Sequence, residues 1–542
     1  MLSKRSFMKL IIKRLDHFGL IAGKMKELGM VKMINDMLGV DKQQNVTSGH
    51  AVLAMILNGL GFVDRPLSLT PQFFENQAVD VLLDPGIVPE HLNHYRLGRV
   101  LDKIGEFGCE RFFNTIAMTC CKSEGVDCEN HHNDTTTYSV HGKYEKQDDM
   151  QEVTITRGYS KDMRKDLKQL VIETIAAGDG SVPFLAKIWS GNASDSKILA
   201  ERTKNLVTAF SESEEARCLI ADSKLYSEAN VTNLSRIKFI TRIPATIKYE
   251  NMLIERAIQE NVWTEIDEKN RFHEYSVNHF GIEQRWTVVY SEQALSRAKK
   301  LIEKNIKSEE AALKKELYHF QARQYACEAD SISELERIEK RHPFYKIESY
   351  DILKCKKHEK AGRPLKESLT FIYKVKASFK INDDELQRAI QQRSCYVIGT
   401  NILASELSAN EIVSIYKEQD KVEKVFAFLK SPSFFASSVF LKNVNRIQAL
   451  LTVMLLSVLM YSIVQRALRR QLKLSHLTVP NQIKKPIDNP TLKWIFRCFE
   501  GINYIKVEID GVVQYLVDGL NELRVRVIRL LGDDIKSIYK IS

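Results

Sequence analysis

The stretch that most constrains the fold is residues 447–464, IQALLTVMLLSVLMYSIV, a run of 18 residues without a charge between Arg446 and Arg466. A helix of this length can cross the hydrocarbon core of a bilayer. It can also be buried on all sides in a domain large enough to surround it. The chain has 542 residues and no second run of this kind. We therefore predict a buried core helix, with a membrane anchor as the alternative.

Composition and charge are those of a folded protein. Apolar residues make up 44% and charged residues 27% of the chain, which is ordinary for globular domains. The net charge of +10, from 79 Lys and Arg against 69 Asp and Glu, permits nucleic acid as a partner without requiring it. The apolar run near the N-terminus is broken by Lys13, Arg14 and Asp16, so no secretory signal is predicted.

The cysteines do not form a recognisable metal motif. The chain has nine of them at irregular spacing. Cys121 and Cys128 stand near His131 and His132, but no second CxxC pair completes a zinc site. Reduced structural thiols are the better prediction.

Residues 1–128 are predicted to form an N-terminal helical domain. Apolar residues recur there at helical spacing, and the segments are separated by turn signals such as DPGIVPE at 84–90. Short helices joined by turns are compatible with helix-turn-helix DNA binding. They are equally compatible with a plain helical bundle.

Near residue 130 the period changes to that of strands. The order that follows is three strands, a helix, a strand, a helix and a strand. This order predicts a mixed α/β core, whose first part is residues 129–244. The expected strands are 131–145, 151–158, 182–192, 217–224 and 238–244, and the expected helices are 195–210 and 226–235.

Residues 245–394 are predicted to be an insertion into this core, with β segments followed by long amphipathic helices in 292–341, which contain no Gly or Pro. The chain returns to the core at residues 395–465. Residues 466–542 are predicted to be a basic and helical tail, either a phosphate-contacting arm or a solvated segment.

A helix is predicted over residues 411–430, which contain no Gly or Pro. At about 100° per residue, Tyr416, Gln419, Glu423 and Lys430 fall within about 60° of one another on one face. Apolar side chains occupy a different arc. A solvated helix face would look similar, so this pattern gains weight only from the carboxylates upstream.

Asp134 lies at the start of a predicted strand, Asp222 lies at the end of another, and Glu423 lies on the predicted helix. Carboxylate oxygens are the ligands that hard cations such as Mg²⁺ and Mn²⁺ prefer. Two such ions about 3.5–4 Å apart stabilise both the attacking and the leaving oxygen of a phosphoryl transfer. Three converging carboxylates therefore suggest a two-metal phosphoryl-transfer site.

These features resemble the DDE transposases of bacterial insertion sequences, whose ribonuclease-H-like catalytic core is interrupted by an insertion before the glutamate. One group of that family carries a Tyr-Arg-Glu-Lys helix pattern. Tyr416, Glu423 and Lys430 match it, and Gln419 stands where the family usually has Arg. The resemblance extends to Asp134-Thr135-Thr136 and to the segments 158–170, 191–197, 221–227 and 428–462.

The resemblance implies that Asp134 and Asp222 hold one metal ion and that Asp134 and Glu423 hold the other. The two Mg²⁺ or Mn²⁺ ions would support cleavage at transposon ends and strand transfer into target DNA. It further implies double-stranded DNA as the partner, a homodimer on DNA, and a cytoplasmic, nucleoid-associated protein that enters no membrane. The residues expected to contact DNA are Tyr416, Gln419, Lys430, Lys161 and Arg164.

Three alternatives stay open. The first is an inactivated or repurposed relative that binds DNA without cutting it, which the change at Gln419 leaves possible. The second is a membrane protein anchored by residues 447–464. The third is a helical interaction scaffold, for which substituting Glu423 would change nothing measurable.

Overall fold

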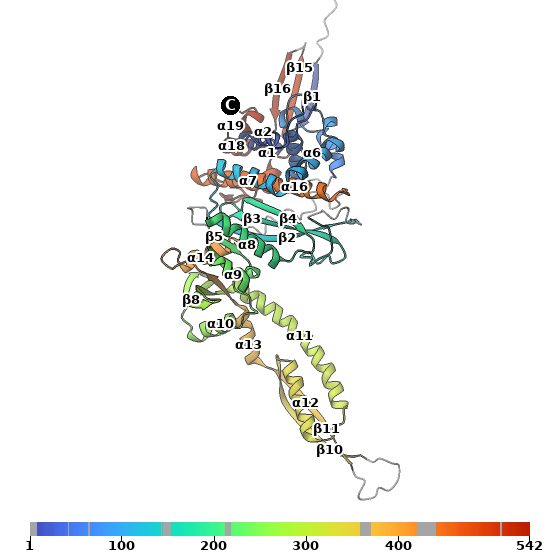
Figure 1. Cartoon of the computed structure of the whole chain (residues 1–542), viewed down its shortest axis with the longest axis vertical. Helices are drawn as coiled ribbons and strands as arrows, with labels where there is room; N and C mark the ends of the chain where they lie inside the picture. The colour runs from blue at the N-terminus through green and yellow to red at the C-terminus, as the bar shows by residue number, and fades with distance from the viewer. Residues whose placement is uncertain are drawn as a thin grey trace, which may run out of the picture. The chain divides into compact units, whose positions relative to one another are not determined.

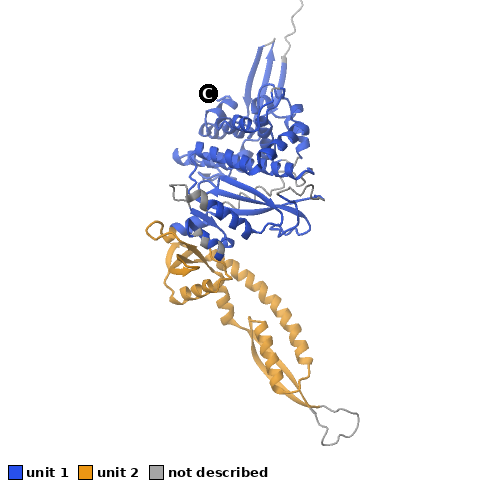
Figure 2. Ribbon diagram, viewed as in Figure 1, with its two compact units in different colours: residues 1–241, 411–542 blue, residues 242–410 orange. Residues whose placement is uncertain are grey.

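The structure, a computed structural model, describes residues 8–41, 43–62, 66–142, 144, 153–211, 218–357, 370–419, 441–509 and 512–541. The chain divides into two compact units (Figure 2). Unit 1 comprises residues 1–241 and 411–542, and unit 2 comprises residues 242–410. The predicted insertion, residues 245–394, falls within unit 2. The predicted N-terminal domain and the tail lie in unit 1, with most of both predicted core segments, whereas residues 242–244 and 395–410 of those segments lie in unit 2.

A mixed sheet forms the centre of unit 1, with five strands side by side in the order β4-β3-β2-β5-β6. β3 runs antiparallel to both of its neighbours, β2 and β4, whereas β5 runs parallel to both β2 and β6. This is the predicted ribonuclease-H-like core. The strands are β2 (Asn130–Val140), β3 (Lys168–Ala177), β4 (Pro183–Ser190), β5 (Cys218–Ala221) and β6 (Lys238–Arg242).

The helices that connect these strands lie where the sequence placed them. α8 (Asp195–Ser211) follows β4, and α9 (Glu228–Leu234) links β5 to β6. One strand was predicted wrongly. Of that predicted strand, 151–158, the described residues 153–158 contribute the isolated bridge between Thr156 and Gln169, and the second strand is β3. β-Branched residues near 155 gave a local strand signal, but pairing depends on neighbours far away in the sequence.

The uncharged run lies in α16 (Val444–Leu474), which is the helix among the described residues that is long and apolar enough to cross a membrane. Its most apolar 18-residue window is 89% buried inside the protein. It runs between the sheet and the N-terminal helices (Figure 1), and contacts α3 (Ser48–Leu60), α6 (His94–Phe107), α7 (Cys109–Glu124) and β4. The predicted buried core helix is confirmed, because the chain itself covers its apolar surface.

The N-terminal region is helical as predicted, with one strand that the sequence analysis missed. β1 (Met8–Arg14) pairs antiparallel with β15 (Asn503–Ile509), which pairs with β16 (Val512–Asp518). The tail therefore joins the N-terminal region. The remaining helices there are α1 (Phe18–Glu27), α2 (Met30–Leu38), α4 (Thr70–Phe74), α5 (Val79–Leu82), α17 (Leu492–Cys498), α18 (Glu522–Leu531) and α19 (Asp533–Ile538).

Unit 2 contains an antiparallel sheet in the order β12-β9-β8-β7. Two helices lie with it, α10 and α13. Their bounds and those of the strands are α10 (Lys248–Glu260), β7 (Thr264–Asp267), β8 (Asn270–His279), β9 (Ile282–Ser291), α13 (Asp383–Arg393) and β12 (Cys395–Thr400).

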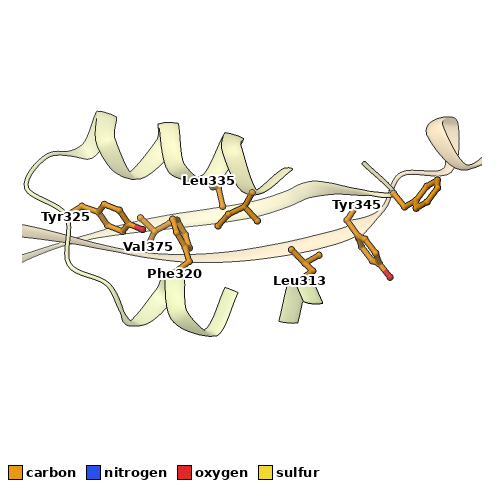
Figure 3. Packing of buried hydrophobic residues seen from close by; sticks show 8 residues of the cluster. Leu313, Phe320, Tyr325, Leu335, Tyr345 and Val375 are labelled. Carbon is orange, nitrogen blue, oxygen red and sulfur yellow. The ribbon is translucent and has the colours of Figure 1, made fainter. Parts of the chain in front are cut away.

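The rest of unit 2 is a helical pair packed on a two-stranded ribbon. α11 (Glu292–Ala322) and α12 (Glu328–Arg341) are the long helices that the sequence predicted. The ribbon consists of β10 (Tyr345–Lys357) and β11 (Thr370–Ile381). The two layers enclose a small apolar core of their own, in which Phe320, Leu335 and Val375 are buried (Figure 3).

Burial of His17 in unit 1 predicts a loss of stability in acid. The ring stacks on Phe496 with centroids 4.1 Å apart, and its Nε2 lies 3.0 Å from the Leu60 carbonyl oxygen. Burial lowers the pKa of His17 to about 4. As the pH falls, the unfolded chain therefore binds a proton at this residue at a higher pH than the folded chain does. The stabilisation is complete above the ordinary pKa of about 6.5 and is lost as the pH falls toward 4, by about 3 kcal/mol in total.

Unfolding by denaturant at a series of pH values would measure this effect. His17→Gln cannot titrate, so the difference between the two proteins isolates the contribution of this ring from that of other groups. We expect the unmodified chain to lose more stability than the variant between pH 7 and pH 4. Parallel curves for the two proteins would contradict the prediction.

Candidate active site

Asp134 and Asp222 are brought side by side by the register of two neighbouring parallel strands. Asn130 pairs with Cys218 and His132 with Ile220, an offset of 88 residues in each case (218 − 130 = 220 − 132). Asp134 and Asp222 have the same offset (222 − 134 = 88), and the backbone of Asp222 is still extended, with φ −69° and ψ 177°. Neighbouring strands lie about 4.8 Å apart, so the two carboxylates are adjacent on one face of the sheet.

The Asp134 carboxylate is held by its own strand and faces a lysine. Its Oδ1 accepts a hydrogen bond from the Thr135 backbone N–H at 2.7 Å. Lys161 Nζ lies 4.0 Å from the same oxygen and donates to the Thr135 carbonyl oxygen at 2.5 Å and to Thr135 Oγ1 at 2.6 Å. The ammonium group of Lys161 is thus fixed beside the first predicted catalytic carboxylate.

Asp195, the first residue of α8, organises this lysine and a second one. Its Oδ1 accepts a hydrogen bond from Thr135 Oγ1 at 2.6 Å, and its Oδ2 lies 3.6 Å from Lys161 Nζ and also pairs with Lys224. Burial alone would raise the pKa of Asp195, but hydrogen bonds from Lys224 and Thr135 outweigh it and lower the pKa. Asp195 is therefore ionised at neutral pH.

Lys224 connects this cluster to the second aspartate, because its backbone N–H donates to Asp222 Oδ1 at 2.9 Å. Asp195 thus binds one lysine beside each aspartate. The sequence analysis did not select Asp195 or Lys224, although each lies in a segment that carries the family resemblance. Sequence spacing could not reveal Asp195, because it is linked to the Asp134 region by contacts with Thr135 of β2 and with Lys161 that form in the folded chain.

Gln419, which was predicted to contact DNA, is buried and bonded to β2. It follows α14 (Ala409–Lys417) and is 6% exposed. Its Oε1 lies 3.1 Å from His132 Nδ1, and its Nε2 donates to the Asn133 carbonyl oxygen at 2.8 Å. An amide both accepts and donates, which a guanidinium cannot do. Gln419 therefore anchors the end of α14 on β2, directly before Asp134.

The other residues predicted to contact DNA lie in different surroundings. Lys161 belongs to the carboxylate cluster, and Tyr416 lies half-buried on α14. Arg164 is exposed and makes two hydrogen bonds to Asp166, from Nε at 3.0 Å and from Nη2 at 2.8 Å. Glu423 and Lys430 lie outside the described residues. The described part of the site therefore brings together Asp134, Asp222 and Lys161 and leaves Arg164 at the surface.

The donor set suits a hard divalent cation in part. Asp134 and Asp222 offer adjacent carboxylate oxygens, the ligand type that Mg²⁺ and Mn²⁺ prefer. Two protein ligands alone do not complete a site. In the described ranges, no group of three or more His, Cys, Asp or Glu side chains could hold a metal ion, and the third predicted ligand, Glu423, is outside them. Among the same described residues, Cys121 and Cys128 belong to no such group.

Unit 1 thus combines a mixed α/β sheet with two aspartates on neighbouring segments, the arrangement predicted for a ribonuclease-H-like core. Residues 149–460, more than half of the chain, match the family model described as the transposase DDE domain. The chain belongs to this family, and its function is that of a transposase. Residues 10–118 match a domain of unknown function (DUF4277), in agreement with an N-terminal domain that has no assigned chemistry.

Among solved structures, the chain is similar to that of the piggyBac transposase synaptic complex with hairpin DNA, determined by cryo-electron microscopy. The sequence identity is 8% and the TM-score is 0.37, with 91% of this chain and 82% of that chain covered. No curated protein matched the chain. The resemblance to DDE transposases is confirmed by the family match alone, and an origin in a bacterial insertion sequence stays a prediction.

Proposed function

We propose that this transposase cuts DNA at the ends of its own element and joins the freed ends to target DNA, using Asp134, Asp222 and Glu423. The observation that carries the proposal is the shared 88-residue offset, which puts Asp134 and Asp222 next to each other on parallel strands. Family membership supplies the reaction class.

Asp134 and Asp222 would hold one divalent ion, and Asp134 and Glu423 a second. Bound there, Mg²⁺ or Mn²⁺ ions supply the activation of water and the stabilisation of the leaving oxygen. The chain contributes the geometry: the Thr135 N–H fixes one oxygen of Asp134, and the Lys224 N–H fixes one oxygen of Asp222. Neither aspartate is needed as a nucleophile, so no covalent intermediate with the enzyme is required.

The remaining predicted residues are proposed to position DNA. Arg164, Tyr416 and Lys430 would contact backbone phosphates, which set the register of a duplex without reading its sequence. Double-stranded DNA is the proposed partner, both as element end and as target. A homodimer on DNA and association with the nucleoid in the cytoplasm are further parts of this proposal.

Cleavage of a labelled duplex that carries the element's own ends tests the proposal. The reaction is run with Mg²⁺ or with EDTA, and the unmodified chain is compared with Glu423→Gln. We expect nicking at the element boundary that needs Mg²⁺ and is lost in the variant. Binding without nicking in both proteins would indicate a repurposed relative instead. Neither binding nor nicking would favour the interaction scaffold.

Asp195→Asn is expected to raise the Mg²⁺ concentration needed for half-maximal cleavage by about 10- to 100-fold, the range seen when groups that orient metal ligands are removed. The substitution weakens the hold on Lys161 and Lys224, so that their charges are free to pair with Asp134 and Asp222 and to compete with the cation. Cleavage rates over a Mg²⁺ titration measure the effect. Asp36→Asn, an equal charge change at the exposed pair with Lys32, is the control. Coinciding titration curves for Asp195→Asn and the unmodified chain would contradict the prediction.

A further inference from the structure

A cavity of about 840 Å³ opens beside the C-terminal half of α16 in unit 1. One wall is the helix face that carries Arg466, Arg469, Arg470 and Lys473. These positions are spaced i, i+3, i+4 and i+7, which places them on one side of a helix. Another part of the lining is the connection between β3 and β4, residues 178–181, and β3 is the neighbour of β2 in the sheet. We call this space the α16 cavity.

Arg466 is part of the wall and is fully engaged by the protein. Its Nε donates to Asp179 Oδ2 at 2.8 Å, and its Nη1 and Nη2 donate to the carbonyl oxygens of Glu124 at 3.1 Å and Gly125 at 2.9 Å. Burial would raise the pKa of Asp179, but the bond from Arg466 outweighs it and lowers the pKa. Asp179 is the one carboxylate in the lining, and its charge cancels that of Arg466.

The lining therefore has one carboxylate against four cations and is positive overall. Arg469 donates from Nε to the Pro490 carbonyl oxygen at 2.8 Å, and Arg470 and Lys473 are exposed. Within the ranges that the structure describes, none of these three cations lies within ion-pair distance of a carboxylate, and Asp179 attracts Arg470 only at longer range. Burial lowers the pKa of Arg469, but a guanidinium stays charged in proteins. Such a grouping of like charges around a hollow attracts an anion.

The form of the cavity favours a chain of phosphates over a single small anion. Arg469 and Lys473 are separated by about 6 Å along the helix axis at 1.5 Å per residue, and the cavity of about 840 Å³ is much larger than one phosphate group. The cavity also lies close to the active site. The Gly178 N–H, in its lining, donates to the Asn130 carbonyl oxygen at 3.2 Å, and Asp134 lies four residues further along β2, about 13 Å away.

We propose that the α16 cavity binds the phosphodiester backbone of DNA through Arg469, Arg470 and Lys473, as a contact separate from the carboxylate site. The inference rests on the proposed function, because it takes DNA as the substrate. Its role is to hold the duplex a few nucleotides from the bond that is cut. Phosphate contacts of this kind add affinity and register but no sequence preference.

The salt dependence of DNA binding by the full chain tests this proposal. Arg470→Gln/Lys473→Gln removes two exposed charges from the cavity. Arg529→Gln/Lys540→Gln removes two exposed charges elsewhere in unit 1 and is the matched control. The slope of log K against log salt is expected to fall by about 1.8 in the cavity variant, from about 0.9 per phosphate contact, with about 10- to 100-fold weaker binding at about 0.1 M salt. The control is expected to keep the slope of the unmodified chain.

Titration with inorganic phosphate is the second arm. Unchanged DNA binding in the cavity variant overturns the proposal. If that variant instead loses binding of inorganic phosphate, the cavity is a small-anion site. Arg470→Gln alone, with an expected slope change of about 0.9, gives the same answer if the double variant fails to fold. Nicking by the unmodified chain is scored separately, so loss of the proposed function and loss of this inference are distinguishable.

Discussion

Replacing Asp134 or Asp222 by Asn is expected to lower the rate of DNA cleavage by at least about 10³-fold, which corresponds to about 4 kcal/mol of transition-state stabilisation. The amide keeps the shape of the side chain but removes the charge that a divalent cation needs, and cation chemistry at such sites supplies several kcal/mol. Single-turnover cleavage of an end-bearing duplex in excess Mg²⁺ measures the loss.

The effects of the two substitutions on the cleavage rate are also expected to be non-additive, because removing one residue of a catalytic unit already removes most of the contribution of the whole unit. The double variant Asp134→Asn/Asp222→Asn should cleave no more slowly than the poorer of the two single variants. Asp36→Asn, which alters an exposed pair with Lys32, is the control for a change in net charge. Cleavage within a few-fold of the unmodified rate in either single variant would contradict the prediction.

Thermal stability distinguishes a catalytic role of Asp134 and Asp222 from a structural one. The two carboxylates lie on adjacent strands, so neutralising one removes a repulsion between like charges. The thermal unfolding midpoint of each single variant should therefore be equal to or above that of the unmodified chain. A lower midpoint in both variants would mean that the carboxylates hold the sheet together and would weaken the assignment of a catalytic role.

The order of elements in the core could be predicted from the sequence because it rests on local signals. The buried strand ending at Asp222 and the uncharged run of α16 are each defined by the composition of a few adjacent residues. The adjacency of Asp134 and Asp222 was expected from a resemblance, and the structure adds its cause. The parallel register of β2 and β5 sets the offset, and register depends on which strands become neighbours.

The features that the sequence analysis missed all depend on distant partners. β1 is a strand because β15, near the other end of the chain, pairs with it. The helix predicted over 411–430 put Gln419 on one face with Glu423, which predicted a DNA contact, and nothing in the sequence indicated that Gln419 bonds to β2. No feature of the neighbouring sequence distinguishes Asp195 from other acidic residues at the start of a helix. Hydrogen bonds between distant segments are determined by the fold and cannot be read from spacing.

The second large effect is expected at the buried ion pair behind the active-site strand. Glu173 on β3 is fully buried and pairs with Arg202 on α8, whose Nε and Nη2 donate to its two oxygens at 2.9 and 3.1 Å. Asn133 Nδ2 and Trp189 Nε1 complete the set at 2.8 and 2.9 Å. Burial would lower the pKa of Arg202, but the Glu173 carboxylate outweighs it and raises the pKa.

Arg202→Met is expected to destabilise unit 1 by about 3–5 kcal/mol, because it leaves a buried carboxylate without a compensating charge. Hydrogen exchange of the β3 amides measures this locally, which avoids assuming a single unfolding transition for a chain with two units. Arg164→Met breaks an exposed pair with Asp166 and is the control, because exposed ion pairs contribute little to stability. Equal exchange rates in the two variants would contradict the prediction.

Removing both charges distinguishes the cost of an unpaired carboxylate from a loss of packing. Glu173→Leu/Arg202→Met is expected to recover most of the stability lost in Arg202→Met, since apolar replacements of similar volume are often neutral at buried ion pairs. Recovery of stability need not restore cleavage. Glu173 also accepts the Asn133 amide, and Asn133 directly precedes Asp134. A double variant that is stable but cleaves slowly would show that this pair positions the catalytic strand, whereas full recovery of both would assign it to stability alone.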